Sequence, residues 1–266
     1  MLTTRFVDGA PNWIDVGTPD TEGAASFYGG LFGWEFAPAG PDTGAGGHGF
    51  FRLAGRIVAG GVRTAPEQGP PAWTVYFQSP DADATAKTAR QARGSVPVPP
   101  TDVMRQGRTA ILADQSGVPF GIREPAQHKG IEAAGEAGTL CWVELYTPDI
   151  ARAAAFYHSV LGWETSAVTF PDGVYTSVNP AGTGEEGMFG GLVPPAEDLA
   201  GAEPGPPHWL PYFGVGDTDA VVARAVELGG RVRLPATSLA GVGRLARLED
   251  PYGARFAVIE GDPRET

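Results

Sequence analysis

The chain contains the same sequence twice. The segment WIDVGTPDTEGAASFYGGLFGWE at residues 13–35 returns as WVELYTPDIARAAAFYHSVLGWE at 142–164, and the two copies are identical at 11 of 23 positions. The blocks at 70–84 and 112–124 also return, at 206–220 and 248–260. Self-similarity over this much of a chain indicates an internal duplication, which requires two units of one architecture.

The lengths agree with two domains. A chain of 266 residues can form two units of about 130 residues, each with its own core. We expect domains at 1–126 and 139–266, joined by a linker at 127–138 that is polar, contains glycines and has no strong period. The offset between copies grows from 129 residues at Trp13/Trp142 to 136 at Pro70/Pro206, so a loop of the second copy should hold a net insertion.

Charge and composition exclude several classes of protein. The net charge of −12 argues against nucleic acid and anionic membranes as partners, because binding phosphates needs clustered Lys and Arg. The N-terminus has no apolar signal region and no segment approaches 18 apolar residues, so we expect a cytoplasmic protein. The single cysteine, Cys141, excludes an intrachain disulfide and a cysteine-based zinc site. Few lysines beside abundant Ala, Gly, Pro and Arg suit a high-GC bacterium.

Each copy opens with a strand and a helix. Pro19 ends a short apolar run, and Asp20 suits a helix N-cap. An apolar stripe at helical spacing follows and ends at a glycine, which predicts helices at Thr21–Phe32 and Ile150–Leu161. The stripe residues are Ala24, Phe27, Tyr28 and Leu31 in the first copy and Ala153, Phe156, Tyr157 and Val160 in the second.

The second half of each copy repeats this order. In the first copy, a strand at Trp73–Gln78 precedes a helix at Asp83–Arg93, with later strands at Ile111 and Phe120. The second copy has the equivalent segments at Trp209–Val215, Asp219–Leu228 and Phe256–Ile259.

These motifs resemble a known family. A strand, then Pro-Asp, then a helix that carries Phe-Tyr and ends at Gly-Trp resembles the opening of the vicinal oxygen chelate superfamily of glyoxalases, bleomycin-resistance proteins and extradiol dioxygenases. The later blocks at Asp114 and Asp250 resemble its second βαβββ module. The resemblance implies an α+β fold with four βαβββ modules in two tandem domains, whose sheets curl into half-open cups that hold a small molecule.

The resemblance also implies positions for metal ligands, and these have to be checked one by one. The metal-using members of the superfamily place metal-donor side chains at the positions that correspond to Trp13 and Trp142, near Val75 and Pro211, and to Gly121 and Ala257. A divalent cation needs imidazole, carboxylate or thiolate donors, which these residues lack. We therefore expect no metal at the family position and no cofactor.

Side-chain alternation gives the candidate site residues. Residues two and four after a cup-facing position face the cup as well, so Trp13, Asp15 and Gly17 should share the cup side of one strand. Trp142, Glu144 and Tyr146 should share that of its counterpart. Asp15 and Glu144 are candidate catalytic carboxylates, or else structural groups paired with an arginine or backbone amides. The two tryptophans either fill the space of a metal or stack on a ligand.

Other polar residues are weaker candidates. His208 precedes the Trp209 strand and would reach the mouth of the second cup as an acid or base. Tyr76 and Tyr212 occupy equivalent places and would offer hydroxyls to a ligand, although core packing explains them equally well. The remaining histidines, His48, His128 and His158, are expected on the surface.

Three functions remain open. The first is metal-independent binding of a hydrophobic or aromatic small molecule, as in drug sequestration. The second is a metal-free enzyme that isomerises, cyclises or hydroxylates a secondary metabolite, with Asp15 or Glu144 as base. The third is a metal-dependent glyoxalase or dioxygenase. We rank them in this order, expect a monomer or homodimer, and expect Glu144 to matter more than Asp15, because Tyr146 and His208 stand where the first copy has Gly17 and Ala72.

Overall fold

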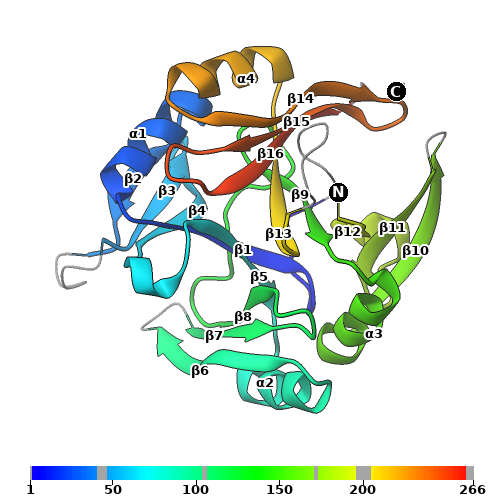
Figure 1. The fold of residues 1–266 in the computed structure, drawn as a ribbon. Helices are drawn as coiled ribbons and strands as arrows, with labels where there is room; N and C mark the ends of the chain where they lie inside the picture. Colours follow the sequence, from blue (N-terminus) through cyan, green and yellow to red (C-terminus); the bar gives the residue numbers. More distant parts are fainter. Residues whose placement is uncertain (1, 41–46, 104–106, 171–172, 196–204, 262–266) are drawn as a thin grey trace.

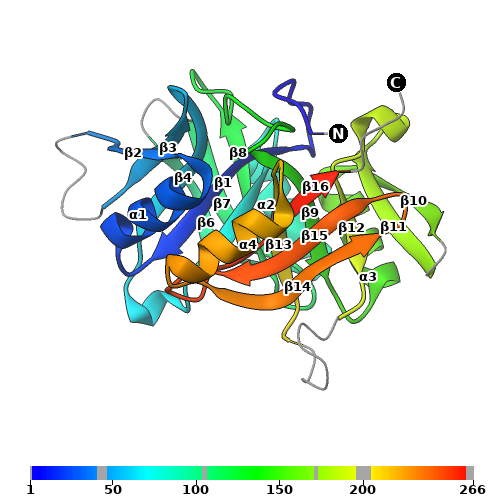
Figure 2. The same cartoon turned by 90° about the horizontal axis from the view of Figure 1, so that it is seen from above.

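A computed structural model of the chain describes residues 2–40, 47–103, 107–170, 173–195 and 205–261. It contains two mixed eight-stranded sheets, one from each copy of the repeat (Figures 1 and 2). The first has the order β2-β3-β4-β1-β5-β8-β7-β6, and the second has the order β10-β11-β12-β9-β13-β16-β15-β14.

The elements have the following bounds. The first sheet consists of β1 (Pro11–Thr18), β2 (Glu35–Pro38), β3 (Gly49–Leu53), β4 (Arg56–Arg63), β5 (Ala72–Gln78), β6 (Ser95–Val103), β7 (Gly107–Ala113) and β8 (Pro119–Pro125). The second consists of β9 (Leu140–Tyr146), β10 (Trp163–Phe170), β11 (Gly173–Pro180), β12 (Gly190–Val193), β13 (His208–Gly214), β14 (Arg231–Leu239), β15 (Gly243–Glu249) and β16 (Arg255–Gly261). The helices are α1 (Thr21–Phe32), α2 (Ala82–Gln91), α3 (Ile150–Leu161) and α4 (Thr218–Glu227), with 3₁₀ turns η1 (Pro66–Gln68) and η3 (Gly184–Gly187).

Strand pairing shows how the modules combine. Within each module the first strand pairs in parallel with the last, β1 with β4 and β5 with β8. β1 and β5 then pair antiparallel and join two modules of the same copy into one sheet, as β9 and β13 do in the second copy. The predicted α+β fold with four βαβββ modules is confirmed, and each sheet combines modules within one copy.

The first helix of each copy has the predicted bounds. The carboxylate of Asp20 accepts a hydrogen bond from the Gly23 amide at the start of α1, and Asp149 does the same for α3. Gly33 ends α1 with φ 74°, a left-handed conformation that glycine adopts without a steric penalty.

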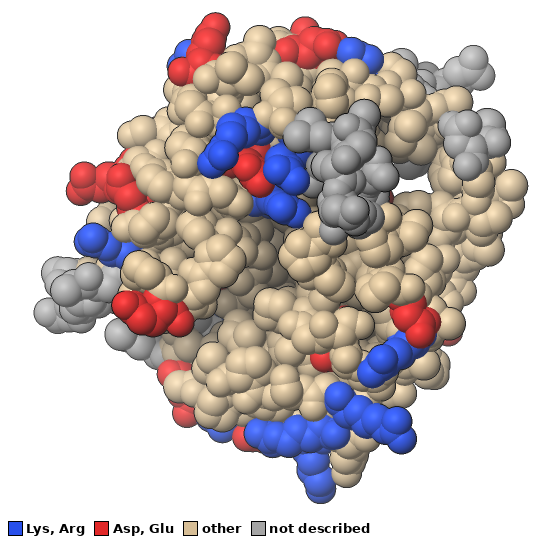
Figure 3. Space-filling model, in the orientation of Figure 1, with Lys and Arg blue, Asp and Glu red and all other residues tan. Residues whose placement is uncertain are grey.

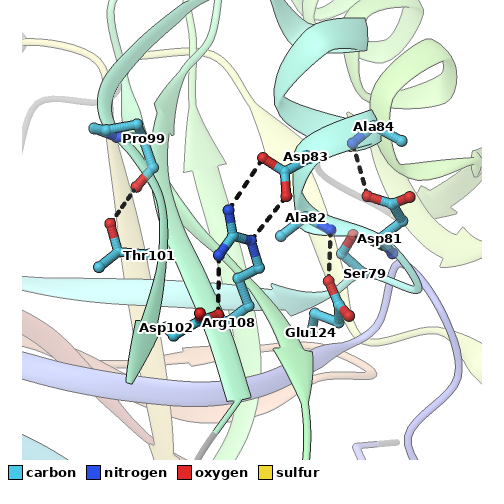
Figure 4. Close-up of polar contacts among 10 residues, drawn as sticks. All are labelled: Ser79, Asp81, Ala82, Asp83, Ala84, Pro99, Thr101, Asp102, Arg108 and Glu124. Carbon is cyan, nitrogen blue, oxygen red and sulfur yellow. Dashed lines mark hydrogen bonds and ion pairs between the residues drawn. The ribbon is translucent and has the colours of Figure 1, made fainter. Parts of the chain in front are cut away.

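The second helix of each copy begins one residue earlier than predicted. Asp81 and Asp217 are the N-caps of α2 and α4. Asp83 lies in the first turn of α2, where Arg108 of β7 binds its carboxylate and that of Asp102 (Figure 4). Arg244 binds Asp219 in the same way. The helices also end earlier than predicted, since α2 ends at Gln91 rather than Arg93 and α4 at Glu227 rather than Leu228.

The two copies are joined by reciprocal contacts, which we call the seam. Helix α1 packs against α4, and α2 packs against α3. The Tyr28 hydroxyl donates to Asp250 at 3.0 Å, and its counterpart Tyr157 donates to Asp114 at 3.4 Å. Burial raises the pKa of both carboxyls.

Two tryptophans extend the seam. The Trp34 indole donates to the carbonyl of Gly138 at 2.8 Å, and Trp163 donates to that of Gly9 at 2.8 Å. Each tryptophan thus binds the segment that precedes the first strand of the other copy. The two copies share a continuous aromatic core as a result.

The segment between the sheets is packed rather than loose. Ile131 and Ala133 are buried, and the Ile131 amide donates to the carbonyl of Asn12 on β1 at 2.9 Å. The net insertion of the second copy falls in the connections from β11 to β12 and from β12 to β13. Residues 196–204 of the second connection lie outside the described residues. None of the helices that the structure describes has the length and apolar character needed to cross a bilayer.

Candidate functional site

The two faces of each sheet carry different residues. Ile14 and Val16 of β1 are buried in the shared core. The alternate residues Trp13 and Asp15 lie on the opposite face. We call this face of the first sheet the first cup, and the corresponding face of the second sheet, around Glu144, the second cup.

Three tyrosines bind one carboxylate in the second cup. The hydroxyls of Tyr146 and Tyr212 donate to Glu144 Oε2 at 2.8 and 2.6 Å, and Tyr175 donates to Oε1 at 3.0 Å. Burial, and then the charge of Glu144, raise the pKa of Tyr175 and of Tyr212 well above the ordinary value. The phenols therefore remain protonated and serve as donors.

An indole, an imidazole and a guanidinium surround this network. The Trp142 indole donates to the Tyr175 hydroxyl at 2.8 Å. The His208 ring is stacked on Tyr146, with a centroid distance of 5.0 Å and an interplanar angle of 9°. The Arg247 guanidinium lies over the Tyr146 ring, 4.9 Å from its centroid. Trp142 and Glu144 are both partly exposed.

The tautomer of His208 follows from its hydrogen bond. Its Nδ1 lies 2.8 Å from the carbonyl oxygen of Pro206. A carbonyl only accepts, so Nδ1 carries the hydrogen and Nε2 is the basic nitrogen of the neutral ring.

The first cup has a smaller network around Asp15. Burial raises the pKa of Asp15 from 3.8 to about 6, and hydrogen bonds with Tyr76 and Trp13 act in the opposite direction. Trp13 is only 6% exposed, and the Arg123 guanidinium lies 5.1 Å from its ring centroid. The indole is thus buried in the first cup.

Two histidines border the first cup, which corrects the expectation that they lie on the open surface. The rings of His48 and His128 lie 5.5 and 6.5 Å from that of Phe50. Phe50 in turn meets Trp13 edge-on at 5.8 Å. Burial lowers the pKa of His48. His158 is exposed on α3, as predicted.

The structure brings the predicted residues together in two groups. Trp142, Glu144, Tyr146, His208 and Tyr212 meet in the second cup. Trp13, Asp15 and Tyr76 meet in the first.

Three further residues were missed: Tyr175, Arg123 and Arg247. Both arginines alternate with buried apolar residues, Ile122 beside Arg123 and Ala246 and Leu248 around Arg247. The alternation rule, applied to the last block of each copy, would have placed them on the cup side.

The residues at the family metal position do not form a ligand set. Strand register places Trp13, Tyr76 and Gly121 side by side on β1, β5 and β8. Trp142, Tyr212 and Ala257 form the equivalent row. Each row offers one phenol and neither imidazole nor carboxylate, which does not fit a divalent cation. Within the described part of the chain, no three His, Cys, Asp or Glu residues are grouped so that they could hold a metal ion.

Solved structures share this fold. The chain matches 2,2',3-trihydroxybiphenyl 1,2-dioxygenase from Sphingomonas wittichii with a TM-score of 0.62 and 17% identity, over 96% of this chain and 91% of that one. It matches the Mn(II)-bound glyoxalase from Novosphingobium aromaticivorans with a TM-score of 0.62 and 16% identity, over 97% and 86%. At such low identity the likeness shows the fold alone.

Sequence relatives are closer. The anthracycline biosynthesis protein DauV of Streptomyces sp. is 40% identical over 97% of this chain and 95% of its own. The putative glyoxylase CFP32 of Mycobacterium tuberculosis is 35% identical over 98% of both. The model of the glyoxalase/bleomycin resistance protein/dioxygenase superfamily matches residues 10–122 and again residues 139–258. The chain therefore belongs to this superfamily, as a tandem form with two domains.

Proposed function

We propose that the second cup binds a hydrophobic or aromatic small molecule without a metal. The partial exposure of Trp142 supports this, because an accessible indole can stack on a ligand, whereas Trp13 is buried. A small apolar cluster that includes Leu210, Leu245 and Ala257 lies beside it, separate from the main core.

The observation that carries the proposal is the set of three hydroxyls on Glu144. These bonds fix the carboxylate before a ligand arrives, so binding does not have to order it. Oε2 accepts two of them and Oε1 only one. Since a carboxylate oxygen accepts about two hydrogen bonds, Oε1 retains capacity for a hydroxyl or amino group of a ligand.

The names of the relatives favour an aromatic natural product. Two of them, DauV and DnrV, are named for anthracycline biosynthesis, and both cover almost the whole chain. The proposed activity is therefore sequestration or presentation of such a molecule.

The test is a titration with aloe-emodin, a flat hydroxylated anthraquinone. Binding is measured as the quenching of tryptophan fluorescence. We expect Glu144→Gln to weaken binding about tenfold, since a charge-assisted hydrogen bond becomes neutral. Asp15→Asn, the same change in the first cup, is the matched control and should leave binding unchanged. A larger loss from Asp15→Asn would show that the ligand occupies the first cup, and absence of binding by the unmodified protein would refute the proposal for this class.

A metal-free enzyme is the second candidate, and the buried carboxyl of Asp15, beside Tyr76 and Trp13, favours it. The pKa of about 6 for Asp15 suits a general base near neutral pH. Glu144 is less suited, because both of its oxygens already accept a tyrosine hydroxyl and only Oε1 keeps spare capacity. Turnover that rises with pH through about 6 and disappears in Asp15→Asn would support this function.

A further inference from the structure

One edge strand of the second sheet lacks the features that prevent pairing with other molecules. Each sheet ends in two edge strands, β2 and β6 in the first and β10 and β14 in the second. An edge strand presents unpaired N–H and C=O groups, and proteins protect such edges with short strands, prolines or charged side chains. β2 has only four residues, and β6 and β14 contain prolines. β10 has eight residues and contains no proline, lysine or arginine.

The outer edge of β10 is accessible. The side chains of Thr165, Ser166, Ala167 and Thr169 are exposed. β10 lies at the margin of the molecule in two perpendicular views (Figures 1 and 2). Among the strands that the structure describes, only β11 pairs with it. The outer edge can therefore receive another strand.

This edge is almost free of charge. The single charged residue of β10 is Glu164, whose carboxylate accepts hydrogen bonds from the Asn179 side chain and the Gly182 amide, both at 3.3 Å. Figure 3 shows mainly uncharged side chains along the right-hand margin, where β10 runs in Figure 1. Two copies of a chain with a net charge of −12 repel each other, so they meet most easily where charge is absent.

The pairing of β10 with β11 shows which backbone groups point outward. In an antiparallel pair, residues that exchange hydrogen bonds alternate with residues whose N–H and C=O groups point away from the partner strand. Trp163 pairs with Pro180, which has no N–H, so this pair does not exchange both bonds. Alternation from Trp163 assigns outward N–H and C=O groups to Thr165, Ala167 and Thr169.

The outward residues are symmetric about Ala167, since a threonine stands two residues before it and another two residues after it. When two β10 strands pair antiparallel with Ala167 opposite its own copy, Thr165 of each chain faces Thr169 of the other. Each of these pairs exchanges two hydrogen bonds, and threonines are favourable neighbours across strands. Glu164 then faces Phe170, so like charges do not meet. An edge that matches itself when reversed fits a twofold interface.

We propose that the chain forms a homodimer in which two β10 strands pair antiparallel about a twofold axis at Ala167. The second sheets of the two copies then form one continuous sheet. The proposal does not depend on a ligand, since none of the tyrosines that bind Glu144 lies on β10.

The size of the contact sets the strength of the dimer. A strand of eight residues is roughly 27 Å long, so pairing covers on the order of 300 Å² on each copy. Stable interfaces cover about 800 Å² on each partner. The dimer should therefore be weak and reversible, with a dissociation constant on the order of 10 µM.

The test is sedimentation velocity of the full-length protein from about 1 to about 200 µM, over which we expect a shift from monomer to dimer. Ala167→Lys and Ala167→Glu each place two like charges opposite each other on the axis, and each should weaken the dimer about tenfold. An equimolar mixture of the two variants places opposite charges on the axis and should restore the dimer.

The controls separate this contact from a general effect of charge or folding. Val98→Lys adds the same charge at an exposed position of β6, the edge of the other sheet, and should leave the dimer unchanged. Thr165→Pro removes an outward N–H without adding charge, and should weaken the dimer. Circular dichroism checks the fold of each variant.

Each outcome bears on the axis at Ala167. A wild type that stays monomeric at about 200 µM refutes the proposal. A dimer that persists in both charged variants and in Thr165→Pro refutes the use of β10. If Ala167→Glu weakens the dimer and Ala167→Lys strengthens it, total charge is responsible rather than this contact. If the mixture stays monomeric while each variant is folded, the axis does not pass through Ala167.

Discussion

Replacing Asp15 by asparagine should stabilise the protein above neutral pH and leave its stability unchanged in acid. Burial raises the pKa of Asp15 from 3.8 to about 6, so ionisation is harder in the folded state than in the unfolded chain. The contribution of Asp15 to the stability of the folded state is therefore greatest at pH values below 3.8. This contribution is lost as the pH rises through about 6. Asparagine keeps the shape and an acceptor for Tyr76 and Trp13, and it never ionises.

The magnitude follows from the shift. The pKa moves by about two units, each worth about 1.4 kcal/mol, so ionised Asp15 costs the folded state about 3 kcal/mol. In a chain of this length that corresponds to a rise in melting temperature of roughly 5–10 °C for Asp15→Asn above pH 7. The difference should shrink steadily on acidification and vanish near pH 4.

The assay is differential scanning calorimetry of the wild type and the variant at several pH values between 4 and 8. The reasoning is refuted if Asp15→Asn lowers the melting temperature at neutral pH, because Asp15 would then be an ion-paired structural group. A stabilisation of equal size at every pH would also refute the reasoning, since such a stabilisation would not depend on the ionisation of Asp15.

Three further predictions concern the second cup, the seam and the metal. Glu144→Gln should lower the free energy of unfolding by about 2 kcal/mol in urea titrations, because three charge-assisted hydrogen bonds become neutral, and unchanged stability would contradict the role of the tyrosines. Tyr28→Phe should cost about 1–3 kcal/mol in the same assay and more than Tyr157→Phe, since the bond of Tyr28 is 3.0 Å long and that of Tyr157 is 3.4 Å. Dialysis against a chelator should change neither the melting temperature nor aloe-emodin binding, and a loss that one specific metal restores would overturn the reading of the donor set.

Sequence patterns predicted most of the fold because the repeat gave each pattern twice. The caps at Asp20 and Asp149 and the glycines at Gly33 and Gly162 set the bounds of α1 and α3 by local geometry alone, and the structure confirms them. Module pairing could not be predicted, because it depends on which strands meet in space, and β1 can pair with a strand from either copy.

The candidate site was predictable only where a rule applied along a single strand. Alternation on β9 placed Trp142, Glu144 and Tyr146 on one face, and the structure brings them together. It could not show that Tyr175 of β11 reaches Glu144 across β12, since that contact depends on sheet curvature. Gly191, which pairs with Glu144, leaves the space through which the Tyr175 ring passes, and a Cβ atom there would meet the Tyr175 hydroxyl.

The reciprocal contacts of the seam mean that this chain is built like a homodimer whose subunits have been fused. Each half covers the other with equivalent residues, so the surface that one half would expose alone is nearly complementary to itself. A half chain should therefore associate with a second copy of itself rather than remain monomeric. A substitution in the seam must suit both halves, whereas the hydrogen bonds to Asp15 and to Glu144 come from residues of the same copy. The seam therefore constrains both copies together, which leaves the cups free to diverge into one with a buried indole and one in which three tyrosines bind a carboxylate.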